Sequence, residues 1–296
     1  MGVPFFYIML NLYLSLIKFS HTIFALPFAL IGFYLAFIKY QPIDFSLKFI
    51  YVLLAMIFAR SAAMAFNRYI DRNIDANNPR TKDREIPAGK ISSKAALSFV
   101  IFNVIGFILV TFFINDLCFY LSPLALLVVL GYSYTKRFTW LCHYILGLGL
   151  ALAPIGAYLS ISGEFNFLSL ILGVSVFFWV GGFDIIYALQ DAIFDISFKL
   201  KSIPARFGVE KAILISRISH FLSANFLLMG IFNMDKYYPE VGILSWLAFS
   251  FFIILLIRQH FLVKIKDLTK INQAFFESNG LASILLGSLI IIDLFF

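Results

Sequence analysis

The chain has only 16 acidic residues, and seven of them fall in two short segments. In the first segment Asn67, Asp71 and Asp75 are spaced i, i+4 and i+8, which places their side chains along one face of a helix. Carboxylate and amide oxygens are hard ligands that suit Mg2+, an ion that takes one or two protein carboxylates and completes its shell with water and phosphate oxygens. The spacing therefore predicts a magnesium site for a phosphorylated substrate.

The second segment places Asp184, Tyr187, Asp191 and Asp195 at relative positions 0, +3, +7 and +11. We expect these residues to share one face of a continuous helix. The segment interrupts an otherwise apolar run, where a carboxylate such as Asp184 is costly and indicates function. The second segment is therefore a second candidate for binding metal and diphosphate.

Basic residues accompany both segments and could neutralise the remaining charge of a diphosphate. They are Lys82, Arg84, Lys201 and Arg206. Arg60 lies two helical turns before Asn67 on the same face, and it requires an anion: the diphosphate, a carboxylate on a second substrate, or simply an Asp of the chain. The alternative for both segments is a solvated helix end with capping residues.

The elements that carry these segments must be membrane helices. The chain has 296 residues, 61% hydrophobic and 13% charged, which excludes a soluble enzyme and a disordered chain, and its charge of +7 is too scattered for nucleic-acid binding. Runs of about 20 apolar residues match a bilayer core of about 30 Å. Nine runs are predicted, at about 19–38, 47–67, 95–114, 117–135, 140–161, 167–190, 212–233, 241–262 and 275–296. The predicted fold is all-α and multi-pass.

The basic residues predict the orientation of these spans. The connections after the even-numbered spans carry 18 of the 23 Lys and Arg residues, and the other connections carry 3. Since positive charge marks the cytoplasmic side, the N-terminus is expected there, with both acidic segments at the same membrane face. We expect one transmembrane domain over 1–296 around a central cavity open to the cytoplasm.

The cysteines and histidines offer no further site. Cys118 and Cys142 are expected at opposite membrane faces, too far apart for a disulfide. The four histidines have no metal-ligand spacing and are expected to be structural or interfacial.

Taken together, these motifs resemble the UbiA superfamily of intramembrane aromatic prenyltransferases, whose members have nine helices and two Asp-rich motifs. Asn67, Asp71 and Asp75 match the first motif, N-D-x-x-D-x-x-x-D, with Arg68 where the family often has its first Asp. The second segment matches D-x-x-Y-x-x-x-D-x-x-x-D, and a family-like K-S-x-x-x-x-F-G run follows at 201–208. Lys18 and Arg60 fall where the family has basic residues, and the Tyr-rich segment 132–137, which includes Tyr132 and Tyr134, also matches.

The resemblance implies transfer of a polyprenyl group from an allylic diphosphate to an aromatic acceptor. Mg2+ would bind at Asn67, Asp71, Asp75, Asp191 and Asp195. Either Asp191 or Asp184 would polarise the acceptor or accept its ring proton, and aromatic rings, Tyr187 among them, would stabilise an allylic cation. Lys82, Arg84, Lys201, Arg206, Arg60 and Lys18 would bind the anionic groups of the substrates.

The resemblance leaves the acceptor open. 4-Hydroxybenzoate, in ubiquinone biosynthesis, is the first expectation, with Arg60 or Lys18 binding its carboxylate. With Arg68 in place of the Asp, the first motif resembles that of a bacterial subgroup associated with menaquinone made through futalosine. The acceptor in that subgroup is 1,4-dihydroxy-6-naphthoate. The expected setting is a bacterial inner membrane with no obligatory protein partner. A membrane transporter and a lipid-phosphate hydrolase are the alternatives of other classes.

Overall fold

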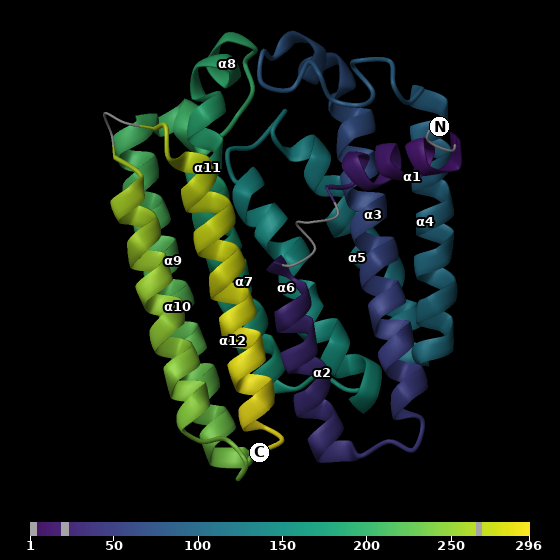
Figure 1. Ribbon diagram of the computed structural model, residues 1–296, viewed down its shortest axis with the longest axis vertical. Helices are drawn as coiled ribbons and strands as arrows, with labels where there is room; N and C mark the ends of the chain where they lie inside the picture. The colour runs from purple at the N-terminus through teal and green to yellow at the C-terminus, as the bar shows by residue number, and fades with distance from the viewer. Residues whose placement is uncertain (1–4, 19–23, 265–267) are drawn as a thin grey trace. The chain divides into compact units, whose positions relative to one another are not determined.

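The computed structural model describes residues 5–18, 24–264 and 268–296, and helices are the regular elements throughout these ranges (Figure 1). The helices are α1 (Phe5–Leu16), α2 (Leu26–Tyr40), α3 (Phe45–Asn77), α4 (Ser93–Ile114), α5 (Asp116–Thr135), α6 (Cys142–Ser162), α7 (Phe167–Ala188), α8 (Ala192–Ser197), α9 (Ile203–Tyr237), α10 (Ile243–Leu262), α11 (Ile271–Gln273) and α12 (Asn279–Asp293). A 3-10 turn (Leu189–Asp191) joins α7 to α8, and a π-helical turn (Ala274–Ser278) joins α11 to α12.

The described residues contain eight helical segments long and apolar enough to cross a membrane, and α2 is a shorter apolar helix of 15 residues. This confirms the all-helical, multi-pass prediction, with nine as an approximate number of spans. The chain divides into two compact units: unit 1 comprises 1–22 and 50–134, and unit 2 comprises 23–49 and 135–296.

In unit 1, aromatic side chains join α3 to its neighbours. The rings of Phe58 and Phe102 pack with centroids 6.1 Å apart between α3 and α4, and the ring of Phe66 lies 5.9 Å from that of Tyr134 on α5. Helix α1 runs crosswise at the end of α3 that carries the first acidic segment (Figure 1), where Leu16 is buried with Ala65. The first acidic segment is therefore held by packing on several sides.

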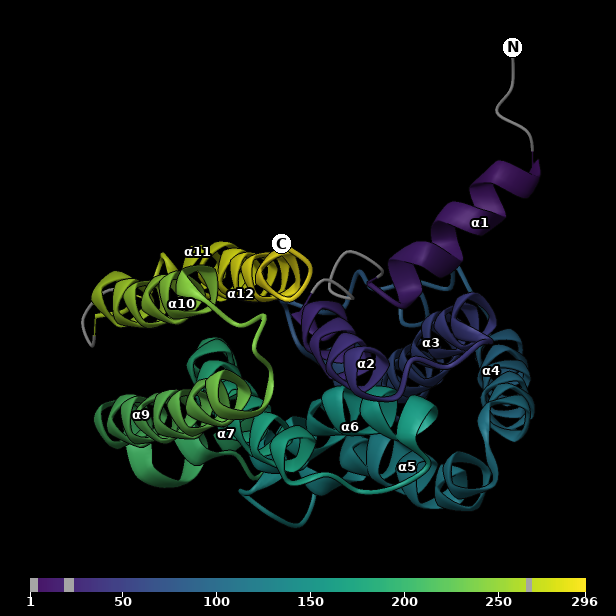
Figure 2. The same ribbon diagram turned by 90° about the horizontal axis from the view of Figure 1, so that it is seen from below.

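In unit 2, α7 packs between α6 and α9, and α10 packs against α12 (Figure 2). A glycine permits the close approach of α6 and α7, because a Cβ at Gly147 would lie 2.4 Å from the backbone oxygen of Phe177. This contact lies at the middle of α7, two turns before Asp184. Unit 2 therefore holds the second acidic segment on a tightly packed helix pair.

The N-terminal part of the chain differs from the prediction. Helix α1 was not predicted, and α2 begins at Leu26 rather than near residue 19 because Pro27 occupies its first turn, where proline is favoured. Lys18 therefore lies outside the first span, exposed in the turn that follows α1. Residues 19–23 of the predicted span lie outside the described residues.

The second acidic segment is not one continuous helix, so the prediction of a single face is wrong. Helix α7 ends at Ala188, and the 3-10 turn closes with Ala192 N–H donating to Leu189 O before α8 begins. A 3-10 turn rotates the chain more per residue than an α-helix, so it changes the faces of the residues after it. Asp184 and Tyr187 are thus on α7, Asp191 is in the turn and Asp195 is on α8.

Candidate active site

The first acidic segment lies on the last three turns of α3, as the spacing predicted. Asn67 Nδ2 donates to Asp71 Oδ2 at 3.0 Å, which fixes the orientation of the amide and directs its oxygen away from that carboxylate. Both side chains are half-buried. Two oxygen-bearing side chains one helical turn apart are therefore oriented together on α3.

Asp75 is held by arginine in the same unit. Arg84 Nη1 donates to both of its carboxylate oxygens, at 2.7 and 2.9 Å, and Arg68 Nη1 lies 4.0 Å away. Asp75 and Arg68 are 5% and 4% exposed, so these charges meet where water screens them little. Thr81 Oγ1 donates to Asp75 O and completes the attachment of the following loop. Arg68 therefore supports the site through Asp75.

The other candidates in unit 1 are spread along it. Arg60 is half-buried in α3, and its Nε is a buried atom with no hydrogen-bond partner among the described residues. Lys82 and Lys18 are exposed. Tyr134 is partly exposed and packs on Phe66. Arg60 and Arg68 each have a buried Nε without a hydrogen-bond partner among the described residues, and of the two Arg68 is the one that lies near Asp75.

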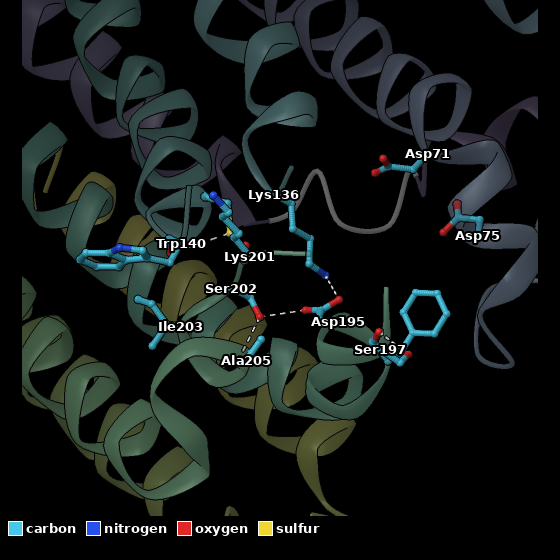
Figure 3. Close-up of polar contacts among 12 residues, drawn as sticks. Asp71, Asp75, Lys136, Trp140, Asp195, Ser197, Lys201, Ser202, Ile203 and Ala205 are labelled. Carbon is cyan, nitrogen blue, oxygen red and sulfur yellow. Dashed lines mark hydrogen bonds and ion pairs between the residues drawn. The ribbon is translucent and has the colours of Figure 1, made fainter. Parts of the chain in front are cut away.

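Asp195 is the centre of the contacts in unit 2 (Figure 3). Its side chain is fully buried, Lys136 Nζ lies 2.8 Å from Oδ1, and Ser202 Oγ donates to Oδ2 at 2.8 Å. Burial alone would lower the pKa of the Lys136 ammonium, but the Asp195 carboxylate outweighs burial and raises that pKa above its ordinary value. Lys136 is therefore held in its charged form against Asp195.

Ser202 connects this ion pair to the start of α9. It is the N-cap residue of the helix, and its Oγ accepts the N–H of Ala205 at 3.3 Å while its hydroxyl donates to Asp195. The backbone is tied to the same place, since Lys201 N–H donates to Lys136 O at 2.7 Å. The start of α9 and the ion pair thus form one connected structure.

The predicted basic residues of this unit contact the 138–140 segment. Lys201 Nζ donates to Phe138 O at 3.2 Å. The Arg206 guanidinium lies 5.5 Å from the centre of the Trp140 ring and 5.3 Å from that of Phe207. Lys201 and Arg206 therefore lie in unit 2 beside the Lys136 segment, whereas Lys82 and Arg84 belong to unit 1.

Asp184 has a partner that sequence reasoning missed. His143, at the start of α6, places Nδ1 2.7 Å from Asp184 Oδ2. The other ring nitrogen, Nε2, accepts the N–H of Ile203 in the first turn of α9 at 3.3 Å. The two residues are 41 positions apart, and no helical periodicity relates them.

Tyr187 lies among aromatic rings of unit 2. Its ring centroid is 4.3 Å from that of Phe275 in the π-helical turn, and Phe275 meets Phe183 edge-on at 5.2 Å. Phe24 joins both at 5.6–5.9 Å. Tyr187 therefore belongs to an aromatic cluster, one turn after Asp184 on α7.

The donor chemistry fits Mg2+. No group of three or more His, Cys, Asp or Glu side chains in the described ranges forms a ready-made metal cluster. Mg2+, however, requires only one or two protein carboxylates. Asn67 and Asp71 in one unit, and Asp191 and Asp195 in the other, offer such oxygens. Asp75 and Asp195 have Arg84 and Lys136 as cationic partners.

Comparisons with known proteins identify the family of this chain. The UbiA prenyltransferase family model matches residues 25–281, across both units. Curated relatives named 4-hydroxybenzoate octaprenyltransferase, from Aliivibrio fischeri strains MJ11 and ATCC 700601 / ES114, are 29% and 30% identical, over 78% of this chain and 78–79% of theirs.

Solved structures resemble this chain over most of its length. The apo structure of a UbiA homolog from Aeropyrum pernix K1 is 30% identical with a TM-score of 0.81, covering 93% of this chain and 98% of that one. A UbiA homolog from Archaeoglobus fulgidus, bound to GPP and Mg2+, shares the fold at 19% identity with a TM-score of 0.72, covering 96% and 99%. The chain is thus an enzyme, and the transporter alternative is set aside. The resemblance to intramembrane aromatic prenyltransferases is confirmed, and the chain belongs to the UbiA prenyltransferase family.

Proposed function

We propose that this enzyme transfers a polyprenyl group from an allylic polyprenyl diphosphate to an aromatic acid in quinone biosynthesis. The observation that carries the proposal is the row of carboxylates Asp184, Asp191 and Asp195, which runs from the end of α7 through the 3-10 turn into α8, with Lys136 2.8 Å from Asp195. Such carboxylates and cations are typical of a site for metal and diphosphate. The curated relatives are named as 4-hydroxybenzoate octaprenyltransferases, which supports the acceptor class.

Mg2+ would be held by Asn67, Asp71 and Asp75 in unit 1 and by Asp191 and Asp195 in unit 2. When bound, it supplies positive charge that stabilises the departing diphosphate. A family member from Archaeoglobus fulgidus is bound to GPP and Mg2+, which supports this cofactor.

The chain's own cations would bind the remaining diphosphate charge, through Lys82, Arg84, Lys201 and Arg206. Lys136 and Arg84 pair with Asp195 and Asp75, which places both cations at carboxylates that a diphosphate complex would approach. Arg60 has a buried Nε whose hydrogen bond is not made by any described residue, which suits it to the carboxylate of the acceptor or to the diphosphate. Lys18 is a second cation for either group.

The aromatic cluster around Tyr187 would face the allylic cation. Each π-face offers a cation attraction worth about 0.5–2 kcal/mol when desolvated. Phe275 packs edge-on against Phe183, and in the proposed mechanism these rings would keep out water that would otherwise add to the cation. The acceptor ring carbon then forms the new carbon–carbon bond, and an Asp of the second segment accepts the ring proton.

The acceptor is 4-hydroxybenzoate in our first proposal, which puts the enzyme in ubiquinone biosynthesis. 1,4-Dihydroxy-6-naphthoate, in menaquinone biosynthesis, is the second candidate. The observation that favours it is Arg68, a buried arginine beside Asp75 at a motif position where the family often has Asp. Both acceptors carry a carboxylate and would use the same chemistry.

The enzyme would act as one domain in a bacterial inner membrane, with its N-terminus in the cytoplasm and without an obligatory protein partner. The experiment is an assay of the purified protein with a short allylic diphosphate and Mg2+, with each acid offered separately and the products identified by mass. Prenylated 4-hydroxybenzoate supports the first proposal. Prenylated naphthoate alone supports the second, and no prenylated acid from either refutes both.

A further inference from the structure

The contact between His143 and Asp184 depends on tight packing of α6 against α7. Gly147 lies one turn after His143 on α6, and it faces the backbone of α7 so closely that a Cβ there would be 2.4 Å from Phe177 O. His143 itself is 2% exposed. Because the two helices are fixed at this distance, the imidazole can be placed on the Asp184 carboxylate without an intervening water.

The backbone of α9 determines which nitrogen of His143 carries the proton. Ile203 N–H donates to Nε2 at 3.3 Å, so Nε2 must be the acceptor and the ring proton must be on Nδ1. Nδ1–H then donates to Asp184 Oδ2 at 2.7 Å. The contacts on its two nitrogens therefore fix the orientation of the imidazole, and its Nδ1 in turn orients the Asp184 carboxylate.

The three acidic residues of the second segment thus differ in their partners. Asp195 is fully buried and holds Lys136 and Ser202 on its two oxygens. The Asp184 side chain is 23% exposed, and its Oδ1 makes no hydrogen bond to any of the described residues. Asp184 therefore combines an oriented carboxylate with an oxygen that a substrate can reach.

We propose that His143 is a positioning residue that holds Asp184 as the proton acceptor of the transfer reaction. This inference rests on the function proposed above. The allylic carbon–oxygen bond breaks and its electron pair leaves with diphosphate, while the ring carbon supplies the pair for the new carbon–carbon bond. The hydrogen on that ring carbon passes as a proton to Asp184 Oδ1, its bonding electrons restore aromaticity, and Asp184 later gives the proton to water.

Two substitutions of similar size isolate the contact. Both His143→Leu and His143→Asn lose the acceptor for Ile203 N–H, but the Asn amide can place a donor where Nδ1 was. We expect His143→Leu to lower kcat by about 10–100-fold with both KM values within threefold, and His143→Asn to recover most of the loss. In an Asp184→Ala background, His143→Leu should lower kcat no further. Equal activity of the Leu and Asn variants, or an undiminished kcat in His143→Leu, overturns the proposal.

A control and a second readout separate positioning from folding. His220 is another buried histidine, with Nδ1 2.8 Å from His260 Nε2, and His220→Leu should lower thermal stability without changing kcat. Nitrogen NMR of 15N-histidine-labelled wild-type protein, assigned by the signals lost in His143→Asn, should show His143 neutral and protonated at Nδ1. Protonation at Nε2 overturns the proposal even if prenyl transfer is confirmed. Conversely, an inactive wild-type protein with the expected tautomer refutes the proposed function alone.

Discussion

Replacing Lys136 with Met tests how the ion pair with Asp195 is built. The two partners are unequal, because the Lys136 side chain is 33% exposed whereas that of Asp195 is fully buried. Lys136→Met leaves the buried Asp195 carboxylate without a counter-charge, and among the described residues Ser202 remains as a hydrogen-bond donor to its side chain. Asp195→Asn leaves an ammonium that can turn to water. The two substitutions should therefore lower the free energy of unfolding by different amounts, although they remove the same contact.

The unequal burial of the two side chains sets the expected loss of stability for each substitution. Removing one partner from a buried ion pair costs about 3–5 kcal/mol, because an uncompensated charge remains. Removing the buried partner and freeing a partly exposed one costs about 1 kcal/mol. At about 2–4 °C per kcal/mol, Lys136→Met should lower Tm by roughly 10 °C and Asp195→Asn by only a few degrees. Combining Asp195→Asn with Lys136→Met should recover most of the loss.

The assay is the fraction of protein that remains monodisperse on gel filtration after heating in detergent with EDTA. Lys199→Met is the matched control, because Lys199 is an exposed lysine of the neighbouring segment. It should leave Tm unchanged. A Tm for Lys136→Met within 2 °C of the wild-type value would refute the reasoning, as would an equal loss for Asp195→Asn.

Three further predictions concern other parts of the site. Asp71→Ala and Asp191→Ala should each reduce transfer about 100-fold or more while the helical fold persists. Near-normal activity of either variant at saturating Mg2+ would show that the substituted aspartate is not a metal ligand. Gly208 in α9 has φ 81° and ψ 169°, a conformation essentially restricted to glycine. Gly208→Ala should therefore destabilise the protein by about 1–3 kcal/mol in thermal unfolding. Gly156→Ala, at a helical position with open space, should not destabilise it. Arg60→Ala should raise KM about 10–100-fold for the substrate that Arg60 binds, and equal changes for acid and diphosphate would make Arg60 structural.

The sequence predicted the parts of this molecule that depend on local pattern. Long apolar runs place most helices, because each membrane helix must satisfy its own backbone hydrogen bonds. The i, i+4 spacing placed Asn67, Asp71 and Asp75 along one face of α3, because residues four positions apart share a helical face. The residues of the second segment were also identified, but their helical face was not, because their spacing does not distinguish a 3-10 turn from an α-helical one.

Contacts between distant elements could not be predicted. Lys136 lies 59 positions before Asp195, and His143 lies 41 positions before Asp184. The first pair depends on how α8 and the start of α9 pack against the segment before α6, and the second depends on how α6 packs against α7. Both are properties of the folded unit. The positive-inside pattern nevertheless placed Lys136 and Asp195 at the same membrane face. That pattern was the one signal in the sequence that their charges could meet.

The most direct test of prenyl transfer is the stoichiometry of its two products. Diphosphate release and prenylated acid should be measured in the same reactions, with purified enzyme, a short allylic diphosphate and Mg2+, with and without 4-hydroxybenzoate or 1,4-dihydroxy-6-naphthoate. We predict that diphosphate and one prenylated acid form in equal amounts, and that omission of the acid or addition of EDTA stops both. Diphosphate release at the full rate without any acid, accompanied by free prenyl alcohol, would contradict the account and indicate a hydrolase.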